Sequence, residues 1–98
     1  MAGDTIFALS SGALPAGVAI IRLSGPKALE AVRRIVTLPS EVQSRHSYLR
    51  SIRNRNNEII DSGLVLYFPG PKSFTGEDCI ELQVHGSRAV VDAIFSEL

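Results

Sequence analysis

The sequence has few of the residues that would build a disulfide framework, a membrane span or a metal site. Its 98 residues include one cysteine, Cys79, so neither a disulfide nor a four-thiolate metal site can form within the chain. We expect Cys79 to be a small buried hydrophobic residue. No apolar run approaches the ~20 residues of a membrane-spanning helix, and residues 1–4 do not begin a signal peptide. These absences favour a cytoplasmic protein without metal.

The chain also lacks the phosphate-binding loop G-x-x-x-x-G-K-[ST] of many nucleotide hydrolases. Its nearest candidate, residues 70–73 (GPKS), has neither the Gly-Lys pair nor the earlier glycine. A Ser-His-Asp arrangement stays open in principle, because the chain has two histidines and several serines. No nucleophile elbow supports it. We therefore predict no catalytic residue in this chain.

Charge is balanced overall but divided along the chain. Ten Lys and Arg match ten Asp and Glu, so net charge gives no electrostatic case for binding nucleic acid. Residues 1–55 carry eight basic and three acidic side chains, whereas residues 56–98 carry two and seven. Such halves can fold against each other, or two copies can pair head to tail.

A local basic cluster lies in the first half of the chain, at Arg45, His46, Arg50, Arg53 and Arg55. It could touch RNA phosphate groups. Because no pair of aromatic residues is interleaved with these cations, a solvated hairpin face is the favoured interpretation.

Composition and patterning indicate a single α+β domain. Hydrophobic residues make up 45% of the chain and charged residues 20%, as in ordinary globular proteins. Alternating and helical patterns predict a mixed or antiparallel sheet with two helices. The expected strands are residues 5–9, 18–23, 48–53, 64–68 and 79–85, the expected helices are about 26–37 and 87–98, and the expected turns are 54–57 and 73–78.

The helix limits depend on specific signals. Residues 24–26 (SGP) form a start signal, because proline suits the first helical position, and Pro39 closes the first helix. No capping signal ends the second helix, so we expect the chain to stop inside its own domain.

Arg22 is the one charged residue in an otherwise apolar strand. It shares a face with Val18 and Ile20. Its guanidinium can reach solvent at the strand end, form an internal salt bridge, or bind an anionic or acceptor group of a ligand.

Glu81 lies in the middle of a strand, on a polar face with Gln83 and His85. Such a row is most often solvated. The alternative is a recognition surface, since a carboxylate accepts two parallel N–H bonds. His85 has no second ligand at useful spacing, so we expect a hydrogen-bonding structural residue rather than a metal ligand.

Four blocks of the sequence closely resemble, in order and spacing, the N-terminal blocks of the MnmE/TrmE tRNA modification GTPases. They are residues 4–8 (DTIFA), 20–26 (IIRLSGP), 68–78 (FPGPKSFTGED) and 81–86 (ELQVHG). The likeness covers essentially the whole chain. One departure is Gly86-Ser87 in place of the usual Gly-Gly, which affects the start of the last helix.

The resemblance implies a domain similar to the folate-binding part of aminomethyltransferases. It implies a homodimer that binds 5-formyltetrahydrofolate or a related reduced folate, the one-carbon donor. Carried over by position, the family's folate contacts fall on Arg22 and Glu81. A further lysine contact would lie beyond Leu98, so residues 1–98 would form an incomplete folate-binding and dimerisation domain.

The resemblance also implies a longer protein with helical and GTPase domains, which use GTP, Mg²⁺ and K⁺. With an FAD-containing partner, that protein would install a carboxymethylaminomethyl group on the wobble uridine of tRNA. Two alternatives stay open for this chain. One is a purely structural dimerisation module, and the other is a folate-dependent one-carbon transferase domain.

Overall fold

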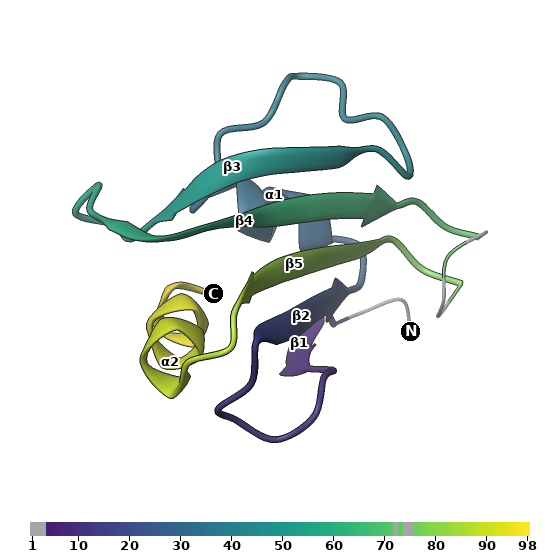
Figure 1. Ribbon diagram of the computed structural model, residues 1–98. Coiled ribbons are helices and arrows are strands. Elements are labelled where there is room, and N and C mark those ends of the chain that lie inside the picture. Colours follow the sequence, from purple (N-terminus) through teal and green to yellow (C-terminus); the bar gives the residue numbers. More distant parts are fainter. Residues whose placement is uncertain (1–3, 72, 74–75) are drawn as a thin grey trace.

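The computed structural model describes residues 4–71, 73 and 76–98, which form one antiparallel sheet with two helices (Figure 1). The strands lie side by side in the order β1-β2-β5-β4-β3, and every neighbouring pair is antiparallel. Their bounds are β1 Ile6–Leu9, β2 Val18–Ser24, β3 Ser47–Arg53, β4 Ile59–Phe68 and β5 Cys79–His85, and the helices are α1 Ala28–Arg33 and α2 Arg88–Glu97. The predicted α+β class is confirmed, with a purely antiparallel sheet.

The hydrophobic core lies on one face of this sheet. The alternating residues Ile21 of β2 and Leu82 of β5 are fully buried there, and both helices contribute to the same cluster through residues such as Val32 and Ile94. Burying apolar surface stabilises a fold by about 25 cal/mol per Å². We call the opposite side of the sheet the outer face. The helices pack against the core face, so the outer face carries the side chains that alternate with the core.

Helix α1 is shorter than the predicted 26–37, and Pro26 precedes it rather than opening it. After its last residue, Arg33, the N–H groups of Arg34 and Ile35 bond to carbonyls three residues earlier, in a tighter turn than an α-helix. Further along, the carbonyl of Ile35 would need the N–H of residue 39 to resume an α-helix. That residue is Pro39, which has no N–H. The backbone N–H of Arg53 donates to the Ile35 carbonyl instead, at 2.8 Å, so the chain docks onto β3.

The second helix agrees with the prediction to within one residue at each end. Ser87 is its N-cap, and the Ser87 hydroxyl oxygen accepts a hydrogen bond from the Val90 N–H at 3.1 Å. Neither helix of the described residues is long and apolar enough to cross a membrane.

Strand β4 is longer than the predicted 64–68, because residues 59–63 extend the pairing with β3. Gly63 permits this extension. A Cβ at this position would lie 2.4 Å from the Gln83 carbonyl oxygen, so a side chain here would clash with the backbone of β5. The predicted turn at 54–57 is confirmed, with Asn57 at φ 64°.

The predicted turn at 73–78 is only partly visible, because Phe74 and Thr75 lie outside the described residues. Gly76 has φ +84°, as a tight turn requires. The Asp78 carboxylate accepts a hydrogen bond from the Gly70 N–H at 2.9 Å. This bond links Gly70, which precedes the predicted turn, to Asp78 at the end of the turn.

Candidate functional site

The two residues implicated by the sequence lie directly opposite each other on neighbouring strands. Arg22 of β2 and Glu81 of β5 are partners in the antiparallel register, and both point to the outer face. Arg22 Nη2 lies 2.7 Å from Glu81 Oε2, with 30% of the arginine side chain and 16% of the glutamate side chain exposed. Of the alternatives left open for Arg22, the structure shows the internal salt bridge. Ligand contact by either residue stays a prediction.

The carboxylate of the ion pair can accept further hydrogen bonds. A carboxylate offers about four acceptor positions. The salt bridge joins one guanidinium nitrogen to one carboxylate oxygen. Charge-assisted bonds of this length are strong and directional. The pair therefore holds a carboxylate in a defined position from which it can accept N–H donors.

The pair occupies the middle of a row that crosses the sheet. In register, Ala8 of β1 lies beside Arg22, and Leu66 of β4 lies beside Glu81. Both neighbours are uncharged, and Ala8 is exposed whereas Leu66 is half-buried, so the Glu81 side of the pair is the less exposed one. Electrostatic interactions strengthen where water is excluded.

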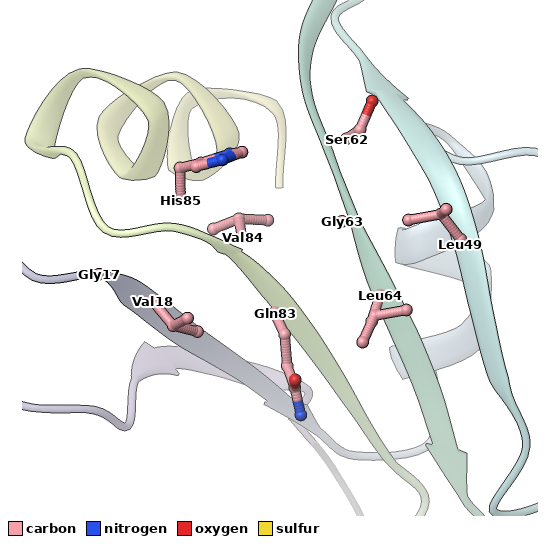
Figure 2. A pocket seen from close by; sticks show the side chains of 9 residues that line it. All are labelled: Gly17, Val18, Leu49, Ser62, Gly63, Leu64, Gln83, Val84 and His85. Atoms are coloured by element: carbon pink, nitrogen blue, oxygen red, sulfur yellow. The ribbon is translucent and has the colours of Figure 1, made fainter.

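A shallow groove lies further along β5, where Gln83 and His85, two and four residues after Glu81, contribute to its lining (Figure 2). Its volume is about 260 Å³. Figure 2 shows its walls on β2, β3, β4 and β5, with apolar side chains and a few polar groups. The lining residues are Gly17, Val18, Leu49, Ser62, Gly63, Leu64, Gln83, Val84 and His85. Apolar walls with few polar groups are typical of ligand sites.

His85, at the end of β5, is held by Asp61 of β4. The Asp61 carboxylate contacts His85 Nδ1 at 2.8 Å and accepts the His85 backbone N–H at 2.9 Å. Partial burial raises the pKa of Asp61, but the bonds from the backbone and ring of His85, the Ser62 backbone bond and the charge of His85 together leave the pKa below its ordinary value. The hydrogen-bonding role expected of His85 is confirmed. Asp61 was missed, because nothing local in the sequence indicates a contact across 24 residues.

The basic cluster predicted on the hairpin is divided among several contacts. The Arg45 guanidinium lies 6.0 Å from the centre of the Phe68 ring. Arg50 donates to the Thr37 carbonyl at 3.0 Å. Arg55 pairs with a carboxylate of α2. Arg45, His46 and Arg55 are exposed, as a solvated face predicts, whereas Arg50 and Arg53 are half-buried.

Cys79 is buried, as expected, with its Sγ atom 3.5 Å from the Ser24 hydroxyl. Among the described residues, no group of three or more His, Cys, Asp or Glu side chains is arranged to hold a metal ion.

Comparison with known proteins extends this description. The family model described as GTP-binding protein TrmE N-terminus matches residues 5–98. Three relatives, each named tRNA modification GTPase MnmE, are 67% identical over 96 residues in Rhizobium meliloti (strain 1021), 62% over 99 residues in Agrobacterium fabrum (strain C58) and 52% over 98 residues in Brucella ovis. Each alignment covers 97% of this chain and 21% of the relative. The chain therefore spans about one fifth of the length of these relatives, and it belongs to the TrmE N-terminal domain family.

Proposed function

We propose that this domain binds a reduced folate of the 5-formyltetrahydrofolate type on its outer face, as part of a homodimeric tRNA modification GTPase. The observation that carries the proposal is the Arg22–Glu81 ion pair, 2.7 Å long, on a sheet face opposite the helices. The groove further along β5 offers apolar surface for the rest of an aromatic ligand.

The chemistry of a pterin suits Glu81. A pterin ring presents a 2-amino group and a neighbouring ring N–H, which are two parallel donors, and a carboxylate accepts such donors in pairs. Arg22 fixes the direction of the Glu81 carboxylate, because the two groups share a short charge-assisted bond. The planar guanidinium of Arg22 also suits polar or anionic groups of the folate.

Isothermal titration of 5-formyltetrahydrofolate tests this assignment. The titration uses both this chain and a version extended to the length of its relatives. Glu81→Gln keeps the shape but loses one acceptor position, so we expect affinity to fall by about 1–3 kcal/mol, or roughly 5- to 150-fold. Glu41→Gln makes the same chemical change at an exposed loop position and should bind like the wild type. Equal affinity in the two variants would remove Glu81 from the site.

A second candidate function is a purely structural dimerisation module. It is favoured by large hydrophobic side chains exposed on the outer face, where Ile6 is 65% exposed, Val18 54% and Leu49 68%. Exposed apolar residues grouped on one face are typical of protein interfaces. A folate-free sample that is already a tight dimer, and does not respond to folate, would favour this candidate over the first.

We further propose that the domain acts within a longer cytoplasmic protein with helical and GTP-hydrolysing domains, supported by Mg²⁺ and K⁺. That protein would work with an FAD-containing partner to place a carboxymethylaminomethyl group on the wobble uridine of tRNA. Support comes from the relatives, which are named tRNA modification GTPases and of which this chain covers 21%.

A further inference from the structure

A second site emerges where the end of α1 meets the hairpin between β3 and β4. Arg33 and Arg34 come from α1 and its C-terminal cap, and Arg53 and Arg55 come from the hairpin. All four line one cleft of about 250 Å³. An adjoining hollow of about 410 Å³ is lined by Arg34, Arg55 and the end of α2. We call the two together the arginine cleft.

The cleft is a product of tertiary structure. About twenty residues separate the two arginine pairs in the sequence, and the hydrogen bond from the Arg53 N–H to the Ile35 carbonyl brings the segments together. In Figure 1 the hairpin lies at the left of the sheet, above α2. None of the four arginines of the arginine cleft lines the groove of the proposed folate site, so the two sites can be tested separately.

Backbone carbonyls hold two of these arginines in place without neutralising them. The Arg33 guanidinium donates to the carbonyls of residues 38, 39 and 40, at 3.2, 2.8 and 3.1 Å. The Arg53 guanidinium donates to the Asn57 carbonyl at 3.0 Å. A carbonyl is a neutral acceptor, so each guanidinium keeps its full charge. The two cations are therefore positioned in advance, at a low cost in side-chain entropy on binding.

Acidic groups do not balance the cleft. Glu97 is the one acidic side chain among the described residues that line it, and its Oε1 accepts both Arg55 Nε at 3.3 Å and the Arg55 backbone N–H at 3.0 Å. Glu58 does not line the cleft, but it accepts a bond at 3.0 Å from the side chain of Asn54, which does. Four arginines around one hollow repel each other. An anion would relieve that repulsion.

We propose that the arginine cleft binds the phosphate backbone of RNA. Guanidinium groups match phosphate oxygens in charge and in planar geometry. The described residues that line the cleft include no aromatic ring, so it offers no platform for stacking bases, and recognition is of the backbone rather than of sequence. The relatives are named for the modification of tRNA, which makes RNA the relevant polyanion.

The test measures binding of a fluorescently labelled tRNA transcript to the full-length protein at several salt concentrations. The variant is Arg34→Gln/Arg55→Gln, and both residues are exposed, so the fold should tolerate the change. We expect roughly tenfold weaker binding and a salt dependence whose slope falls by about one for each arginine that no longer neutralises a phosphate. Arg88→Gln, an exposed position at the other end of α2, makes the same change in charge and should bind normally.

A gain-of-binding variant separates this role from a structural one. Glu97→Gln keeps a side-chain oxygen that accepts the Arg55 N–H but removes the negative charge from the cleft. We expect tighter tRNA binding and a steeper salt slope. Equal tRNA affinity in the Arg34→Gln/Arg55→Gln and Arg88→Gln variants would overturn the proposal. The proposal would also be overturned if inorganic phosphate binds in the cleft while the double variant keeps the tRNA affinity of the wild type, because the cleft would then be a site for a free anion.

Discussion

The Arg22–Glu81 pair makes a quantitative prediction about stability. Replacing Arg22 by Met keeps much of the aliphatic length but leaves Glu81, whose side chain is 16% exposed, without this cation. Losing one member of a fully buried pair costs about 3–5 kcal/mol, whereas exposed pairs contribute less than about 1 kcal/mol. The intermediate exposure of this pair therefore predicts a loss of about 2 kcal/mol in the free energy of unfolding.

The double variant distinguishes this pairing from the separate contributions of the two side chains. Glu81→Gln removes the charge while keeping the shape, so Arg22→Met/Glu81→Gln no longer leaves a carboxylate in apolar surroundings. We expect the double variant to lose about 1–2 kcal/mol less stability than the two single variants lose in sum. Urea denaturation and thermal melting measure the effect, since 1 kcal/mol shifts the melting temperature of a domain of this size by roughly 4–8 °C.

The refuting result is additivity. If the two single-variant losses sum to the loss of the double variant, then Arg22 and Glu81 do not stabilise each other in solution. The proposal that Arg22 holds Glu81 in place for a ligand would then be wrong as well. A coupling confined to low salt would assign the pair to screened surface electrostatics instead.

Two further predictions concern the scaffold. Gly25→Ala should lower the free energy of unfolding by about 2 kcal/mol or more, because Gly25 has φ +138° and an added Cβ would lie 2.5 Å from Thr5 Cα. Gly12→Ala is the control, since a Cβ there meets no atom within 4 Å. Equal melting temperatures for the two variants would contradict this prediction. For Asp61, whose pKa lies below the ordinary 3.8 in the folded chain, the stabilising effect is present above that value and is lost as pH falls through the folded pKa. The free energy of unfolding measured from about pH 5 to 3 should therefore fall less in Asp61→Asn than in the wild type. If the two stability curves run parallel, the His85–Asp61 contact is not the cause of the pH dependence.

Local patterns in the sequence were enough to identify the elements and the faces of the central strands. The alternation in residues 79–85 correctly placed Leu82 in the core and Glu81 on the opposite face. The Asn-rich segment correctly predicted the turn at 54–57, and the second helix was correct to within one residue. These features depend on neighbours within a few residues, so the sequence alone contains the information.

Predictions failed where a distant segment supplied the deciding hydrogen bond. Beyond the end of the first helix at Arg33, the N–H of Arg53, eighteen residues along the chain, bonds to the Ile35 carbonyl, so the segment docks onto β3. Strand β4 begins early because β3 offers it a partner through residues 59–63, which contain polar residues and a glycine. Sequence periodicity records which residues are apolar, but not which backbone groups will meet.

The sequence by itself determined the fold class, the strand faces and the family resemblance, and through that resemblance it predicts Arg22 and Glu81 as folate contacts. Tertiary structure alone decided that Arg22 lies opposite Glu81, that Asp61 holds His85, and that two arginine pairs form one cleft. The physical reason is that strand register and helix docking are set by pairing between segments about 20 to 60 residues apart. Such contacts leave no periodic signal in a single sequence.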